Sequence, residues 1–81
     1  MTNYNFPTIR YGADNAPAVI LIQGMLYDTG YFDDSKQVDG DFGDMTKQAV
    51  LCFQNDHGCC VDGIVGNETW KKLIGEWWCN I

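Results

Sequence analysis

The chain has 81 residues, of which 46% are hydrophobic and 14% aromatic, a composition typical of a folded domain rather than a disordered segment. Its formal net charge is −6, from eleven acidic and five basic residues. Nucleic-acid binding needs clustered basic residues that displace counterions from phosphates, so the charge excludes that class of ligand and disfavours an anionic membrane surface. The longest apolar run, residues 16–22, is far shorter than the roughly 20 residues that span a bilayer.

The length is that of one small domain. We expect residues 8–81 to form this single domain and residues 1–7 to be a loosely ordered N-terminal segment. No charged region followed by an apolar one opens the chain, so no signal peptide is visible. The chain is therefore expected either to leave the cell by another route or to be one part of a larger protein.

The first predicted helix covers about residues 15–28. Ala18, Ile22, Met25 and Leu26 follow helical spacing, and the helix should end near Gly30. A β-meander is the alternative, because residues 19–21 are of the type that also suits a strand. The helical spacing of the segments further along the chain argues against it.

A nine-residue motif occurs twice, at 38–46 and at 61–69, with the pattern V-D-G-x-Φ-G-x-x-T, in which Φ is apolar. Aspartate followed by glycine is typical of a tight turn, because the carboxylate accepts local backbone N–H bonds and glycine tolerates a positive φ. The central apolar residues, Phe42 and Val65, are expected to bury each loop against the core. We interpret each copy as a loop that leads into a helix.

Apolar residues at helical spacing follow each copy of the motif. They predict helices over about 44–56 and from 67 to 77 or 78, the first of which is stopped by Gly58. Asp44 and Asn67 stand where N-cap residues are expected. The sequence therefore predicts an all-α fold, a small closed three-helix bundle with two similar DGxxGxxT loops.

The run from Val38 to Leu73 resembles the peptidoglycan-binding domain that is appended to bacterial and phage cell-wall hydrolases. The family pattern is close to vDGxfGxxTxxAVxxFQxxxGLxvDGxvGxxTWxxL, and the chain matches it at Phe53-Gln54, Thr69-Trp70 and both DGxxG runs. Ile22-Gln23 with Leu26 is similar to the LQxxL of the family's first helix. The resemblance covers roughly residues 8–75, and Cys59 departs from it by replacing a usual leucine.

This resemblance implies a non-catalytic module that binds the glycan or the stem peptide of peptidoglycan. Such a module would hold a linked hydrolase near its substrate, outside the cell or at the cell wall, and we expect a monomer. The alternative is a protein-interaction or prodomain-like docking module that uses the same fold. Exposed side chains at Trp77 and Trp78 would support the alternative, because large apolar groups at a surface often mark a protein contact.

Five residues on or beside the two loops are candidates for ligand contact. Exposed aromatic rings can stack on sugar faces, while amide and carboxylate groups can bond to hydroxyl and peptide groups. On this basis the predicted contact residues are Tyr31, Phe32, Gln54, Asp62 and Trp70. Three of the aromatic residues, Phe42, Phe53 and Trp70, are also predicted to belong to the core.

No catalytic residue, cofactor or metal site is predicted. Cys52, His57, Cys59 and Cys60 are close in sequence, but their spacing is not that of a known zinc finger. His57 has no serine partner nearby, and three short helices seldom enclose a cleft that shifts the pKa of carboxylates.

The four cysteines leave their oxidation state open. A bridge between the adjacent Cys59 and Cys60 would be strained. Two pairings are realistic, 52–59 with 60–79 or 52–60 with 59–79, and four free thiols are the other alternative.

Overall fold

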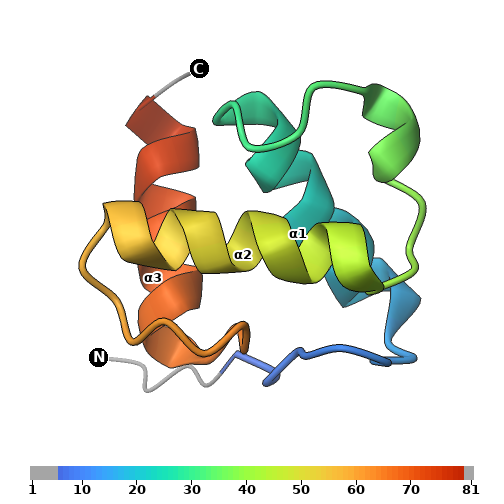
Figure 1. Cartoon of the computed structure of the whole chain (residues 1–81), viewed down its shortest axis with the longest axis horizontal. Helices are drawn as coiled ribbons and strands as arrows, with labels where there is room; N and C mark the ends of the chain where they lie inside the picture. The colour runs from blue at the N-terminus through green and yellow to red at the C-terminus, as the bar shows by residue number, and fades with distance from the viewer. Residues whose placement is uncertain (1–5, 80–81) are drawn as a thin grey trace.

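Three α-helices and one 3₁₀ helix make up the regular structure of residues 6–79, the part of the chain that the computed structural model describes (Figure 1). The elements are α1 (Ala16–Asp28), the 3₁₀ helix η1 (Ser35–Gln37), α2 (Asp44–Asp56) and α3 (Asn67–Cys79). In the view of Figure 1, α2 lies across α1 and α3. The predicted all-α class is confirmed, and within residues 6–79 no β-meander forms.

The helix boundaries follow the predicted ones closely. Asn15 caps α1, since its Oδ1 accepts a hydrogen bond from the backbone N–H of Ala18 at 3.5 Å. At the other end Gly30 adopts φ +93°, and the N–H of Tyr31 donates to the carbonyl of Leu26 at 2.7 Å. A left-handed glycine with this six-residue bond is the Schellman ending of a helix. It turns the chain sharply into the segment that follows α1.

The predicted N-caps of α2 and α3 are each wrong by one residue. Asp44 is the first residue inside α2, and the N-cap is Gly43, whose backbone is extended. The carbonyl of Gly43 accepts the N–H of Lys47 at 3.0 Å, just as the carbonyl of Gly66 accepts the N–H of Trp70 at 2.9 Å. The second glycine of each motif therefore begins the helix, and Asp44 instead places a negative charge in the first turn, where the helix dipole favours it.

The core lies where the three helices and the two motif loops meet. Phe42 and Val65, the central apolar residues of the motifs, are both buried, as predicted. The buried cluster consists of Ile9, Val19, Ile22, Met25, Leu26, Phe32, Phe42, Ala49, Val50, Phe53, Val65, Trp70 and Leu73. Phe42, Phe53 and Trp70 thus occupy the core positions expected of them.

The segment before α1 packs against the start of α3. The ring of Phe6 stacks on Trp70 with centroids 5.1 Å apart, and Trp70 Nε1 donates to the carbonyl of Pro7 at 2.7 Å. Ile9 and Val65 exchange two backbone hydrogen bonds, of 3.1 and 2.8 Å. Of the segment 1–7 predicted to be loosely ordered, residues 1–5 lie outside the described residues.

A buried glutamine on α2 holds the second motif loop. Gln54 Oε1 accepts the backbone N–H groups of Asp62 and Gly63, at 3.1 and 2.9 Å. Its Nε2 lies within hydrogen-bond distance of Asp62 Oδ1, the carbonyl of Ile64 and Thr69 Oγ1, at 3.1, 2.9 and 3.1 Å. One side-chain amide thereby provides hydrogen-bond partners for the N–H groups at the beginning of the turn and for the carbonyl at its end, although the turn has no regular secondary structure of its own. We call this arrangement a glutamine clasp.

Gln23 on α1 makes the same clasp with the first motif loop. Its Oε1 accepts the N–H groups of Asp39 and Gly40, at 3.1 and 2.8 Å. Its Nε2 lies 3.1 Å from Asp39 Oδ1, 3.1 Å from the carbonyl of Asp41 and 2.9 Å from Thr46 Oγ1. Hydrogen bonds from the Asp41 N–H and from Gln23 hold the pKa of Asp39 below its usual range. The two copies of the sequence motif thus make the same pattern of hydrogen bonds to a buried glutamine.

Removing a clasp should destabilise the fold strongly. We expect Gln54→Leu to lower the free energy of unfolding by about 3 kcal/mol or more, because each buried polar group left without a partner costs about 1–3 kcal/mol. Gln48→Leu, the same change on the exposed side of α2, is the matched control and should shift stability by less than about 0.5 kcal/mol. Urea denaturation followed by tryptophan fluorescence measures both. Equal losses in the two variants would show that the clasp contributes nothing specific.

Candidate functional site

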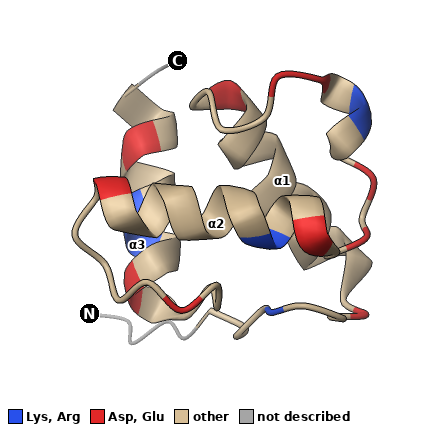
Figure 2. Cartoon of the chain, in the orientation of Figure 1, with Lys and Arg blue, Asp and Glu red and all other residues tan. Residues whose placement is uncertain are grey.

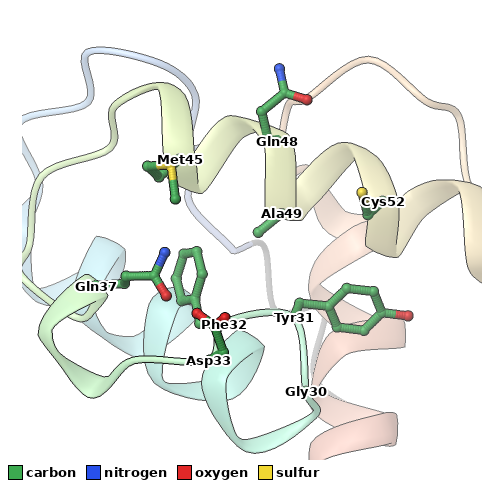
Figure 3. Close-up of a pocket in the computed structure, with 9 residues that line it drawn as sticks. All are labelled: Gly30, Tyr31, Phe32, Asp33, Gln37, Met45, Gln48, Ala49 and Cys52. Atoms are coloured by element: carbon green, nitrogen blue, oxygen red, sulfur yellow. The ribbon is translucent and has the colours of Figure 1, made fainter.

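A groove of about 350 Å³ lies between the segment that follows α1 and one side of α2 (Figure 3). This volume falls at the lower end of the range of small-molecule sites, about 300–1,000 Å³. The groove is lined by Gly30, Tyr31, Phe32, Asp33, Gln37, Met45, Gln48, Ala49 and Cys52. We call it the α1–α2 groove.

Helical geometry explains the α2 wall of the groove. Met45, Ala49 and Cys52 are spaced four and three residues apart, so their side chains lie along one side of the helix. Ala49 is buried and contributes little bulk, which leaves the hollow, while Met45 is 65% exposed at its edge. The wall is therefore apolar, accessible and built on a rigid element.

The opposite wall comes from the chain that leaves α1. The left-handed turn at Gly30 directs Tyr31 along the groove and lets the ring of Phe32 enter the core, where it is 5% exposed. In Figure 3 the ring of Phe32 and the amide of Gln37 lie together opposite Met45, and Tyr31 extends below Cys52. Asp33, whose side chain is exposed, is the charged residue of the lining.

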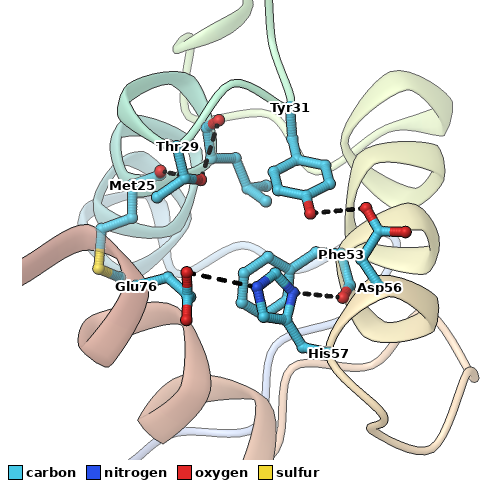
Figure 4. Close-up of polar contacts among 8 residues, drawn as sticks. Met25, Thr29, Tyr31, Phe53, Asp56, His57 and Glu76 are labelled. Atoms are coloured by element: carbon cyan, nitrogen blue, oxygen red, sulfur yellow. Dashed lines mark hydrogen bonds and ion pairs between the residues drawn. The ribbon is translucent and has the colours of Figure 1, made fainter. Parts of the chain in front are cut away.

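A polar and aromatic cluster closes the Tyr31 end of the groove (Figure 4). Tyr31 donates its hydroxyl proton to Asp56 Oδ2 at 2.7 Å, and its ring meets the edge of Phe53 at 5.4 Å. His57 stacks on Phe53 at 4.1 Å, with Nδ1 2.9 Å from the Phe53 carbonyl and Nε2 3.5 Å from Glu76 Oε1. These contacts join the segment after α1 to the end of α2 and to α3, and so fix the position of Tyr31.

The structure separates the five predicted contact residues. Tyr31 and Phe32 line the α1–α2 groove. Gln54 is the buried centre of a clasp, and the Asp62 carboxylate accepts bonds from Gln54 and from the N–H of Ile64. Trp70 is 2% exposed. Ligand contact by Gln54, Asp62 and Trp70 stays a prediction, and these three side chains have partners inside the protein.

Sequence reasoning missed the α2 wall of the groove. The spacing of Met45, Gln48 and Cys52 was visible as a helical face, but it gave no signal that another segment would face it. That segment reaches α2 only because of the turn at Gly30 and the bond between Tyr31 and Asp56.

Within residues 6–79, no three histidine, cysteine, aspartate or glutamate side chains are grouped as ligands of a metal ion. All four cysteines are free thiols, of which Cys59 is buried and the others are exposed, so neither of the two disulfide pairings is formed. Burial raises the pKa of the Cys59 thiol. Over the same described part of the chain, no helix is both long enough and apolar enough to cross a membrane.

Tyr31 should titrate at unusually high pH. Burial, followed by the hydrogen bond to Asp56 and that residue's charge, raises the pKa of Tyr31 to about 12 from 10.0. Because the pKa of Tyr31 is higher in the folded state, the contribution of Tyr31 to stability is fully present below pH 10. This contribution is lost as the pH rises through about 12. Absorbance at the tyrosinate band should show a phase near pH 12 that is absent in Tyr31→Phe and kept in Tyr11→Phe, a change at an exposed tyrosine. A phase that persists in Tyr31→Phe would contradict this assignment.

Comparison with known proteins supports the family resemblance. The family model described as a peptidoglycan binding domain matches residues 15–73. The chain is 39% identical in sequence to a crystal structure of a peptidoglycan-binding protein from Clostridioides difficile in complex with glutamine hydroxamate, with a TM-score of 0.74 over 83% of this chain and 40% of that one.

Two curated proteins are similar in sequence. The chain is 36% identical over 70 residues to the N-acetylmuramoyl-L-alanine amidase CwlM of Mycobacterium tuberculosis, a match that covers 86% of this chain and 16% of the amidase. It is 44% identical over 61 residues to an uncharacterized protein of Kitasatospora aureofaciens, covering 74% of this chain and 50% of that protein. The chain thus spans half or less of these relatives.

The family match covers most of the chain and includes both motif loops, the two clasp glutamines and the α2 wall of the groove. The family is one of binding domains rather than of catalytic ones. The chain belongs to the peptidoglycan-binding domain family.

Proposed function

We propose that the chain contacts peptidoglycan in the α1–α2 groove and holds a linked hydrolase close to its substrate. The observation that carries the proposal is the groove itself, an open apolar hollow on the surface of a peptidoglycan-binding domain. Its two walls are held together through the Tyr31–Asp56 bond, so little ordering is needed when a ligand binds. Such preorganisation favours affinity in a small site.

A linked hydrolase would turn modest affinity into efficient targeting. The similar amidase of Mycobacterium tuberculosis is much longer than the matched segment, which covers 16% of it. When two modules share one chain, binding by the first places the second at a high effective concentration near the same surface. On this proposal the chain acts at the cell wall, outside the cell. Its net charge of −6 favours a monomer, because like-charged copies repel each other.

The predicted contact residues divide into two roles under this proposal. Tyr31 and Phe32 form the wall of the groove, where a sugar or peptide would pack. Gln54 and Asp62 act indirectly, since their clasp fixes the loop before α3. Trp70 supports the same loop from the core. Met45 and Cys52 on α2 complete the contact surface.

Shortening the exposed methionine should weaken retention on the wall. We expect Met45→Ala to reduce binding to purified peptidoglycan sacculi about five-fold, which corresponds to about 1 kcal/mol of lost apolar contact. Val61→Ala is the matched control, because Val61 is 52% exposed and lies outside the groove. A pull-down at low salt measures both. No retention of the unmodified chain would refute the function. Equal retention of both variants would show that the contact with peptidoglycan lies outside the groove.

A second candidate function, docking to a protein, is favoured by one surface feature. Trp78 is 69% exposed at the end of α3, and Ile20 and Leu21 are exposed on α1. The adjacent Trp77 is different, since it packs against the core and donates its Nε1 proton to Asp28 Oδ2 at 2.8 Å. A contiguous surface patch built from such side chains would be typical of a protein contact.

Solution behaviour separates the two functions. We expect gel filtration to show a monomer at all concentrations, and soluble muropeptides to shift backbone NMR signals of residues around the groove. Trp78→Ser should leave both results unchanged. Self-association that Trp78→Ser abolishes, together with an absence of muropeptide shifts, would instead favour the docking function.

A further inference from the structure

A second hollow of similar size adjoins the α1–α2 groove. This acidic extension, of about 330 Å³, lies at the beginning of α2 and shares Gln37 and Met45 with the groove. It is lined by Lys36, Gln37, Asp39, Asp41, Gly43, Asp44, Met45 and Thr46. The two hollows therefore lie next to each other, one largely apolar and one charged, and we call the pair the channel.

The channel carries a clear excess of negative charge. Four carboxylates line it, those of Asp33, Asp39, Asp41 and Asp44, against the single ammonium group of Lys36. Figure 2 shows these acidic positions along the chain on both sides of η1 and at the start of α2. Asp56 adds a further carboxylate at the Tyr31 end. The sum over the lining is therefore −3, from four negative charges and one positive charge.

Such a channel discriminates by the sign of a ligand's charge. A carboxylate on a sugar or at the end of a peptide would meet repulsion from groups with the same charge. A primary ammonium group would find acceptors, because it carries three donors and binds carboxylates in charge-assisted hydrogen bonds. The methylene groups that precede an ammonium group can pack on an apolar surface while the charge stays in water, and Met45, which is 65% exposed, offers such a surface in the groove that Asp33 also lines.

Peptidoglycan presents one ammonium group that depends on the state of the wall. Stem peptides contain a diamino acid whose side-chain amine is free before cross-linking. Cross-linking acylates this amine and removes its charge. We propose that the channel selects stem peptides with a free side-chain ammonium group, so that the domain distinguishes uncross-linked from cross-linked peptidoglycan. This inference rests on the proposed function, and the free side-chain ammonium group is the part of the ligand that the groove recognises.

Paired soluble muropeptides test the inference directly. One carries the free side-chain amine, and the other is the same molecule with that amine acetylated. We expect the unmodified chain to bind the free amine about two- to five-fold more tightly, the range typical of ion pairs in contact with solvent. The preference should shrink at high salt, because the screening length falls to about 3 Å at 1 M. Titration followed by NMR gives both affinities and shows which residues are affected.

Variants assign the preference to the groove. Asp33→Asn should weaken it, because Asp33 is the one carboxylate that lines the apolar groove itself, and the conservative Asp33→Glu should keep it. Asp14→Asn removes the same charge from an exposed position outside the channel and should behave like the unmodified chain. Unchanged urea midpoints would verify that the variants fold. Equal affinity for the two muropeptides, or equal effects of Asp33→Asn and Asp14→Asn, overturns the inference.

The two proposals fail in different ways. If the unmodified chain is retained on sacculi but does not distinguish the muropeptides, the inference falls and the proposed function stands. If it binds neither sacculi nor either muropeptide, the proposed function itself falls. Tight binding to a glycan that carries no stem peptide would place recognition on the sugars and would also overturn the inference.

Discussion

The positions of α2 and α3 each depend on a buried glutamine side chain of the preceding α-helix. Gln23 on α1 holds the loop that begins α2, and Gln54 on α2 holds the loop that begins α3. In each case one amide supplies the donor and the acceptor that an irregular, inward-facing turn requires. Buried backbone groups need such partners, and in this small domain two side chains provide them. The two glutamines thereby link consecutive α-helices and fix how these helices are arranged in space.

The α1–α2 groove is a consequence of this arrangement. The first clasp places the beginning of α2 close to α1, and the left-handed turn at Gly30 sends the chain back along the exposed side of α2. Phe32 then enters the core and Tyr31 reaches Asp56, so both ends of the wall are fixed. A groove held in this manner is preformed, and a ligand need not order it.

Charge and apolar surface are distributed unevenly over this framework. Five of the eleven acidic residues lie on the segments on either side of η1 and at the start of α2, next to the channel (Figure 2). The exposed side of α1 is apolar instead, since no charged residue occurs in α1 before Asp28. One surface can thus select a ligand by charge, whereas the other can only exclude water. This contrast is why the two candidate functions point to different parts of the molecule.

The sequence by itself determined the helices and the family, because spacing and turn chemistry are local properties. The predicted range 44–56 coincides with α2, and the repeated motif marked both loops. The residue pattern was less informative about which side of α1 faces the core. Residues 16–27 of α1 include no charged residue and only one amide, Gln23, so spacing did not show that Val19 would be buried while Ile20 and Leu21 would be exposed.

Only the tertiary structure decided which glutamines are buried and where the groove lies. Gln54 and Gln48 belong to the same helix and the same residue type, yet one is the centre of a clasp and the other lines the surface. The difference arises because the turn in the loop after α2 folds back against one side of the helix and needs hydrogen-bond partners there, at Gln54. The groove has the same origin, since its walls come from α2 and from the segment after α1. A contact between separate segments is a property of their packing, and the residue pattern of either segment alone does not contain it.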